Sequence, residues 1–355
     1  MPRHYLLFAS LAYAYPILRP LEEEIRRRGD VAAWFLEPEC EDLLRDDELR
    51  LKTFREVRDF APVAVFAPGN WVYDFFPGIK VELFHGYPIA KRKAKHDDHF
   101  TIRNWFDIYC TQGPTSTVPF KKLEEKLGFF KVYETGWSKA DAFFRQPATE
   151  EKHSVTPTIL YATTFTRGIS SAWEMPEVIE RLAEEKPWNW KIILHPKITD
   201  LQLIERYKRL AEKHSNITFL GMANDVGILR DSDVMLSDSS SIIVEYMLLG
   251  KPVVTYRNTN PGPQLINVPE LSEIGEALEK ALKRPRSLME TIEHYSLNHE
   301  AHRDGNNCKR ILDAVDDFKA NYEGRIKRKP LNLLRKVKLR RKVASQWLRY
   351  VFNIE

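Results

Sequence analysis

The stretch from Asp231 to Asn258 constrains the fold more than any other part of the chain. It contains an apolar run, Val234–Leu236, then the polar residues Ser237–Ser241, then apolar residues at helical spacing from Ile242, and last the apolar run Val253–Tyr256. Short apolar runs bounded by turn residues are typical of buried strands. A glycine and a proline stand between the helical pattern and the last run, where they end a helix. The stretch therefore predicts a strand, a tight turn, a helix and a second strand, which is a βαβ unit.

The polar turn in this unit predicts a site for an anion. The N-terminus of a helix presents unpaired N–H groups and the positive end of the helix dipole, which phosphate oxygens bind well. We expect Ser239, Ser240 and Ser241 to bind the phosphates of a ligand, because serine hydroxyls add donors with little bulk, and Asp238 beside them to take part in substrate binding. Glu245 follows one turn later, where its carboxylate can accept hydrogen bonds from a ribose diol. The alternative is an ordinary capped helix, since serine is a common N-cap residue.

The same alternation of strands and helices runs along most of the chain. Strands are predicted at 5–9, 31–36, 63–66, 81–84, 107–111, 131–135, 158–162, 191–194, 217–220, 234–236 and 253–256, with helices at 18–28, 48–60, 271–282, 288–295 and 308–322. Residues 146–157 are polar with two prolines and predict a linker. The pattern is typical of doubly wound parallel sheets. We predict an α/β protein with two Rossmann-like domains, 1–147 and 156–322, facing across a cleft, and a basic tail at 323–355.

Two histidines follow predicted strands directly. Ligands of open α/β sheets bind beyond the carboxyl ends of the strands. His85 stands at such an end, and Gly86 after it permits close approach of a ligand to the backbone. A histidine there can take a proton from a hydroxyl. His195 ends a strand of the second domain, where it can donate a hydrogen bond to a phosphate while Lys197 adds positive charge. For both histidines the alternative is a structural role.

Four blocks of this sequence together resemble the CDP-glycerol glycerophosphotransferases, which include the teichoic-acid primases and polymerases and their capsule relatives. The blocks are L-F-H-G-Y-P at 83–88, I-L-H-P-K at 193–197, the serine turn with E-Y at 238–246, and D-G with K-R at 304–310, and they stand in the family's order. The resemblance implies the GT-B fold, with an acceptor domain first and a CDP-donor domain second. It also implies that His85 is the catalytic base, that His195 assists the departure of CMP, and that Asp304 takes part in substrate binding.

Two further segments match the family less well. Y-A-T-T-F-T-R at 161–167 is similar to the family's Y-A-P-T-(F/W)-R, but Thr163 replaces the proline and Thr166 displaces the arginine by one position. The resemblance still makes Arg167 a candidate ligand of the pyrophosphate. Lys91 and Arg92 approximate the basic residues that follow H-G-x-P in the family, and the alternative for them is a solvated loop.

The resemblance implies a transferase that moves glycerol phosphate from CDP-glycerol, or another CDP-alditol such as CDP-ribitol, to a hydroxyl of a lipid-linked glycan or polymer in cell-wall or capsule synthesis. CMP is released. We expect no cofactor and no metal, because the sequence contains neither H-E-x-x-H nor C-x-x-C. The alternatives are another GT-B enzyme, such as a sugar transferase or a UDP-sugar epimerase, and a non-enzymatic protein that binds a membrane surface.

Charge is distributed unevenly along the chain. The net charge is +4, yet residues 324–355 alone carry eleven Lys or Arg and one acid, so the rest of the chain is acidic. This basic tail also contains apolar residues at three- or four-residue spacing, which is typical of a helix on an anionic membrane surface. The alternative is a closing helix packed on the body; nucleic-acid binding is disfavoured because no motif for it is present. With three unpaired cysteines predicting a reducing compartment, we expect a cytoplasmic protein, peripheral on the inner face of the plasma membrane.

Overall fold

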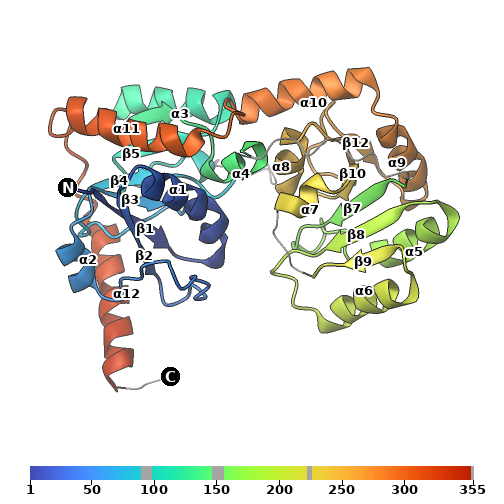
Figure 1. The fold of residues 1–355 in the computed structure, drawn as a ribbon, viewed down its shortest axis with the longest axis horizontal. Coiled ribbons are helices and arrows are strands. Elements are labelled where there is room, and N and C mark those ends of the chain that lie inside the picture. The colour runs from blue at the N-terminus through green and yellow to red at the C-terminus, as the bar shows by residue number, and fades with distance from the viewer. Residues whose placement is uncertain (89–97, 146–155, 222–225, 353–355) are drawn as a thin grey trace. The chain divides into compact units, whose positions relative to one another are not determined.

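The computed structural model describes residues 1–88, 98–145, 156–221 and 226–352. Lys91, Arg92 and most of the predicted linker lie outside the described residues. The chain divides by its internal contacts into two compact units, one of Met1–His85, Asp97–Asp141 and His302–Glu355, the other of Gly86–His96 and Ala142–Ala301. Each unit contains a parallel six-stranded sheet with helices packed against it (Figure 1).

The first unit has the strand order β2-β1-β3-β4-β5-β6. Its elements are β1 (His4–Ala9), α1 (Tyr15–Arg27), β2 (Val31–Leu36), α2 (Phe54–Phe60), β3 (Ala64–Ala67), β4 (Ile79–Glu82), β5 (Ile108–Thr111), α3 (Pro114–Leu127), β6 (Lys131–Glu134), α11 (Asn307–Asn321) and α12 (Leu333–Phe352), with short 3-10 turns η1 (Ala12–Ala14), η2 (Asp98–Phe100) and η3 (Ser138–Ala140). Buried apolar side chains from β1, β3 and β5, many of them aromatic, form its core.

The second unit has the strand order β12-β11-β10-β7-β8-β9. After α4 (Asp141–Phe144) come β7 (Thr158–Ala162), α5 (Met175–Glu185), β8 (Asn189–Ile193), α6 (Leu201–Lys213), β9 (Ile217–Phe219), α7 (Val226–Arg230), β10 (Val234–Ser237), α8 (Ile242–Leu248), β11 (Val253–Tyr256), β12 (Ile266–Val268), η4 (Leu271–Glu273), α9 (Ile274–Leu282) and α10 (Arg286–His299). Its own core lies between the sheet and helices such as α5, α6 and α9. Two Rossmann-like units of this kind are the fold predicted from the sequence.

The predicted strands are confirmed to within two residues at their ends. β2, β7 and β11 have the predicted bounds, whereas β4 ends at Glu82 instead of Phe84. The shift follows from Phe84, whose φ of 58° lies in the left-handed region and breaks the extended backbone. β12 was not predicted, because a strand of three residues gives too short an apolar pattern to recognise.

The helix predicted at 48–60 is wrong in its first half. Only Phe54–Phe60 is helical, and Thr53 begins it with a capping box to Glu56. The residues before Thr53 are extended beside β2: Leu51 donates its N–H to the Trp34 carbonyl at 2.8 Å, and the Trp34 N–H donates to Leu49 at 2.7 Å. Sheet hydrogen bonding thus overrides the helical spacing of the apolar residues.

The chain returns to the first unit after α10, so the division differs from the predicted second domain of 156–322. The N–H groups of Asn307 and Cys308, at the start of α11, each donate to the Asp141 carboxylate at 2.8 Å. Arg28 at the end of α1 donates to Asp313 on α11 at 2.7 Å. These contacts explain why α11 belongs to the first unit; periodicity gives the helix but not its partner.

The basic tail forms α12, which packs in part on the first unit (Figure 1). Lys336 and Arg340 lie 3.4 and 3.0 Å from the Asp74 carboxylate, and Leu339 packs on the first core. Leu334 on the same helix is 88% exposed. The helix thus combines packed contacts with an exposed apolar side chain and further basic residues. Within the described ranges, no helix is long and apolar enough to cross a membrane.

Candidate functional site

Asp238 organises the carboxyl edge of the second sheet. It follows β10, its side chain is fully buried, and its carboxylate accepts hydrogen bonds from Thr163 Oγ1 at 2.5 Å, Thr164 N at 2.9 Å, Ser171 N at 3.0 Å and Ser239 N at 2.6 Å. A buried carboxylate requires such donors, because burying an unpaired one is costly. The carboxylate therefore fixes the loop after β7 to the turn after β10, and Thr163, at the family's proline position, supplies one of the donors.

The serine turn presents groups that are not used inside the protein. Ser239 Oγ accepts from the Thr259 N–H at 2.9 Å, which holds the turn from the β11 side. For Ser240 and Ser241, neither the hydroxyl nor the backbone N–H finds a partner anywhere in the described part of the chain. Ser241 precedes Ile242, the first residue of α8, and its side chain makes no capping hydrogen bond. Several donors are thus available together at the edge where ligands of such sheets bind.

Glu245 lies in the first turn of α8, among groups that the sequence did not link to it. The Tyr87 hydroxyl, from the H-G-Y-P block, donates to the buried Glu300 carboxylate at 2.8 Å. Burial raises the pKa of Tyr87 well above its ordinary value, and the negative charges of Glu300 and Glu245 raise it further. Glu245 therefore lies close enough to Tyr87 for its charge to act on that hydroxyl.

His195 is held by its own loop. Its Nδ1 accepts the Lys197 N–H at 3.1 Å, so in the neutral ring the proton is on Nε2, which is then a hydrogen-bond donor. The His195 ring lies 4.5 Å from the Phe165 ring, and Lys197 Nζ is 5.0 Å from the centre of that same ring. Phe165, in the loop after β7, thus contacts both predicted residues, His195 and Lys197. The sequence did not indicate this contact.

Arg167 borders a cavity of about 510 Å³ in the second unit. Its side chain is 82% exposed, lies over the Trp173 ring at 5.2 Å and is 3.9 Å from the Asp200 carboxylate. Tyr256 and Arg257 also line the cavity. The two guanidinium groups are only loosely paired with carboxylates, so an anionic ligand can engage them.

The carboxyl edge of the first sheet holds His85. This residue is exposed, follows β4, and has its ring 5.5 Å from the ring of Tyr13. A side chain on Gly86 would meet no atom within 4 Å, which leaves open space beside the histidine. Glu82, at the end of β4, is 4% exposed, and burial raises the pKa of its carboxyl well above its ordinary value.

Asp304 lies elsewhere in the first unit, in the loop before α11. Its carboxylate accepts from both terminal nitrogens of Arg310, at 2.8 and 2.6 Å, and this pairing lowers the pKa of Asp304. Gly305 between them has a φ of 71°, a conformation that favours glycine. The D-G-x-x-x-x-R block thus forms an ion pair between Asp304 and Arg310 at the start of α11. Substrate binding by Asp304 stays a prediction.

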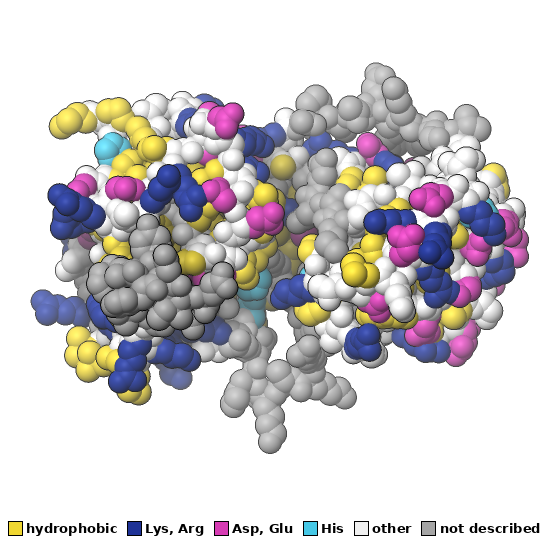
Figure 2. Space-filling view, turned by 90° about the horizontal axis from the view of Figure 1, so that it is seen from below, with side chains coloured by type: hydrophobic (Ala, Val, Ile, Leu, Met, Phe, Trp, Pro, Cys, Tyr) yellow, Lys and Arg dark blue, Asp and Glu magenta, His cyan; other side chains and the backbone are white. Residues whose placement is uncertain are grey.

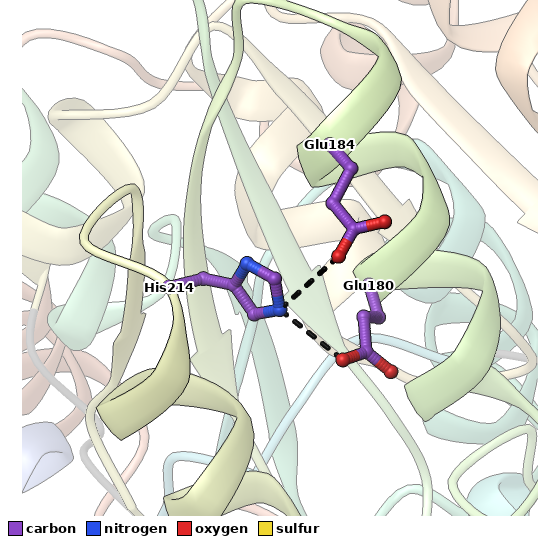
Figure 3. A group of neighbouring side chains, drawn as sticks. All are labelled: Glu180, Glu184 and His214. Carbon is purple, nitrogen blue, oxygen red and sulfur yellow. Dashed lines mark hydrogen bonds and ion pairs between the residues drawn. The ribbon is translucent and has the colours of Figure 1, made fainter.

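One further cluster lies away from these edges, on α5 and the end of α6 (Figure 3). His214 Nε2 lies 3.2 Å from Glu180 and 3.8 Å from Glu184, and Lys213 Nζ is 2.6 Å from Glu180. Lys and Arg are interspersed with Asp and Glu over this face of the second unit (Figure 2). An ammonium group already neutralises Glu180, so we interpret the cluster as a surface ion-pair network.

Several solved structures have a fold similar to that of this chain. The wall teichoic acid polymerase TagF aligns with a TM-score of 0.65 at 13% identity over 91% of this chain and 90% of its own. MnaA from S. aureus, solved with UDP, gives 0.62 at 13% identity over 90% and 97%, and a glycosyltransferase from Rickettsia africae gives 0.55 at 12% identity over 90% and 100%. None of the curated proteins matches the sequence.

The two parallel six-stranded sheets, each with helices packed against it, give the chain the GT-B fold that it shares with these structures. The family model described as UDP-N-acetylglucosamine 2-epimerase matches residues 137–316, about half of the chain. The chain belongs to this family. The predicted kinship with the glycerophosphotransferases is therefore matched in fold, through TagF, while the family model is that of the epimerases.

Proposed function

We propose that the protein transfers glycerol phosphate from CDP-glycerol to a hydroxyl of a lipid-linked glycan or polymer. The observation that carries this proposal is the group of unused donors on Ser240 and Ser241, in a turn that Asp238 fixes. Such donors suit a pyrophosphate. A TagF variant, from a protein of the same fold, was solved after soaking with CDPG, which supports a cytidine donor here.

In the proposed reaction, the acceptor oxygen attacks the β-phosphorus, a new P–O bond forms, and the bond from that phosphorus to the CMP oxygen breaks. His85 takes the proton of the attacking hydroxyl. The Nε2–H of His195 and the donors of the serine turn stabilise the negative charge that develops on the phosphates. Arg167 and Lys197 add positive charge, and Glu245 binds the ribose.

The second candidate is a UDP-sugar epimerase. The family model and MnaA, solved with UDP, favour it. The serine turn serves a UDP-sugar equally well, because the pyrophosphate is common to both ligands. The transfer and the epimerisation differ in the residue that acts as base and in the bond of the nucleotide ligand that breaks.

A panel of nucleotide donors tests the proposal directly. Purified protein is incubated with CDP-glycerol, CDP-ribitol, UDP-N-acetylglucosamine and UDP-glucose, with and without a glycan acceptor, and the products are separated by chromatography. We expect acceptor-dependent release of CMP from a CDP-alditol. Release of UDP, or a change in the sugar of the UDP-linked donor with no CMP release, would instead establish the epimerase or sugar-transferase alternative.

We also propose that α12 attaches the enzyme to an anionic membrane surface. The exposed side chains of Leu333, Leu334 and Val337 and the surplus of basic residues support this. Part of the charge is already paired, since Lys329 lies 2.7 Å from Asp107 and Arg340 contacts Asp74. The side chains beyond residue 341 that were predicted to enter the interface, Trp347 among them, lie mostly outside the described residues.

Two truncated chains separate attachment from folding. A chain ending at Glu323 lacks the tail, and one ending at Arg341 keeps the contacts of Leu339 and Arg340. We expect the shorter chain to lose sedimentation with phosphatidylglycerol vesicles and the longer to retain part of it, with less binding at high salt, because each basic residue contributes roughly 1 kcal/mol near such a surface. If the shorter chain pellets as well as the full one, α12 is not the anchor.

A further inference from the structure

A second group of polar side chains surrounds the approach to His85, and the proposed reaction does not yet use it. Ser10 and Tyr13 stand in the loop after β1, and the Ser10 hydroxyl lies close enough to the Tyr13 phenol to lower its pKa in part, against the larger effect of burial. Gly69, after β3, lies directly against this pair: a Cβ there would be 3.0 Å from Tyr13 Oη and 3.5 Å from Ser10 Oγ. The loop after β3 thus comes close to both hydroxyls only because residue 69 has no side chain.

Glu82 completes the group from β4. It is paired in register with Ala67 on β3 and Tyr109 on β5, so it lies in the middle of the sheet edge. The residue as a whole is 4% exposed, and its carboxyl finds no hydrogen-bond partner anywhere in the described chain. A buried carboxyl without a partner is destabilising, so this one requires an explanation, and a ligand that bonds to it supplies one.

The charges around Glu82 decide its protonation. Burial raises the pKa of its carboxyl well above the ordinary value, and the positive charge of Arg103 offsets only part of this rise. In turn, a charge on Glu82 acts on Tyr13 and raises the pKa of its phenol, in addition to the larger effect of burial. The carboxyl of Glu82 therefore holds its proton to a higher pH than an exposed glutamate does, and its charge reaches Tyr13.

We propose that Ser10, Tyr13 and Glu82 form a subsite that binds the neutral, hydroxyl-rich end of the acceptor beside His85. Each of the three can donate and accept a hydrogen bond, which matches a diol of a polyol or sugar better than a phosphate. The Tyr13 ring lies 5.5 Å from the ring of His85, so a diol bound at Tyr13 has one hydroxyl near the base. The proposal rests on the proposed transferase for the identity of the acceptor, but the subsite itself is a property of the first unit.

Steady-state kinetics of the full chain test the subsite in the proposed reaction. In Tyr13→Phe and Glu82→Leu we expect the acceptor KM to rise at least tenfold, with the affinity for CMP unchanged. Tyr133→Phe is the matched control, because it also loses one phenol hydrogen bond, to Asp317, in the same unit. Unchanged acceptor KM in Tyr13→Phe, in a wild type that transfers, overturns the subsite and leaves the transferase intact.

The pH profile separates a binding role of Glu82 from a structural one. In the wild type the acceptor KM should rise with pH as Glu82 loses its proton and ceases to donate. Glu82→Gln keeps a donor of similar shape at every pH, so its acceptor KM should stay low and its profile should be flat in this respect. A wild-type profile that Glu82→Gln leaves unaltered would contradict the proposal.

Binding of glycerol gives a readout that does not depend on transfer. Saturation-transfer NMR with glycerol as the probe should show contact with the wild type and Tyr133→Phe and a clear loss in Tyr13→Phe and Glu82→Leu. If the wild type binds glycerol in this way but releases no CMP from any CDP-alditol, the transferase is wrong and the subsite stands. Absence of saturation transfer in the wild type, or equal transfer in Tyr13→Phe, overturns the subsite.

Discussion

The carboxyl edges of the two sheets differ in how far their polar groups are paired within the protein. In the second unit, Asp238 is fully buried and accepts from donors on two loops. In the first unit, Glu82 is nearly as buried and has no hydrogen-bond partner in the described chain. The comparison indicates that the second edge is preorganised by the protein, whereas the first leaves the Glu82 carboxyl without a partner in the described chain, as the proposed subsite requires.

The largest expected effect is on turnover, and it comes from a substitution at the carboxyl edge of the first sheet. His85→Ala should lower turnover by about two to four orders of magnitude, the usual range for a lost general base, while the affinity for CDP-glycerol changes little, because the base acts on the acceptor. CMP release and calorimetry measure the two quantities. His294→Ala, on the exposed face of α10, is the control. Near-normal turnover in His85→Ala would remove the assignment of the base.

The next largest effect is on stability, and it comes from a substitution at the carboxyl edge of the second sheet. Asp238→Ala leaves several buried donors without an acceptor, and each such donor costs about 1–3 kcal/mol. We expect the free energy of unfolding of the second unit to fall by roughly 3 kcal/mol or more, measured by urea denaturation. Asp304→Ala removes a more exposed ion pair and should cost less than about 1 kcal/mol. Equal losses in the two variants would show that the Asp238 network does not hold the edge together.

Removing single donors from the serine turn should have a smaller effect. Ser240→Ala and Ser241→Ala should each weaken donor binding by about 1.5–3 kcal/mol, the range for a hydrogen bond to a charged group, without loss of stability, since neither hydroxyl has a partner in the described chain. Calorimetry with CDP-glycerol measures this, with Ser287→Ala on α10 as the control. Unchanged affinity in both variants would place the phosphates elsewhere.

The smallest effect is a dependence of stability on pH. Because the pKa of Glu82 is raised in the folded state, its contribution to stability is complete below about pH 4 and is lost as the pH rises from there towards the raised value. Glu82→Gln has no proton to lose, so it should melt at a higher temperature than the wild type near pH 8 and at the same temperature near pH 4. The test is to measure the melting temperatures of the wild type and of Glu82→Gln from pH 4 to pH 8. If the two melting temperatures change with pH in parallel, the Glu82 carboxyl is not buried.

The sequence predicts the strands and the serine turn because both depend on neighbouring residues. β7 and β11 are apolar runs between turn residues, and the turn stands between a strand and a helix. The network of Asp238 was not predictable in this way, because Thr163 and Thr164 are more than seventy positions away in the chain. The local sequence pattern therefore predicts where the carboxyl edge of the second sheet lies. It does not predict the hydrogen bonds of Asp238 that hold the loops of this edge together.

The errors have the same cause. Residues 48–53 have helical spacing, but Leu49 and Leu51 form hydrogen bonds with Trp34 of β2 in place of helical ones. Tyr13 and Glu82 gave no signal, since a tyrosine in a loop and a glutamate in a strand are unremarkable until their neighbours are known. The burial of Glu82, its lack of a partner in the described chain and the closeness of Tyr13 to His85 are visible only in three dimensions.

The return of α11 to the first unit has a consequence for synthesis on the ribosome. The Asp141 carboxylate receives its two N–H donors only when Asn307 and Cys308 have emerged. At about 5–20 residues per second, roughly 160 residues of the second unit pass before then. The second unit is continuous over this stretch and can complete its fold first, while the earlier strands wait with their α11-facing surface uncovered. The first unit can thus complete its contacts with α11 only after the second unit has been made, although its strands are made first.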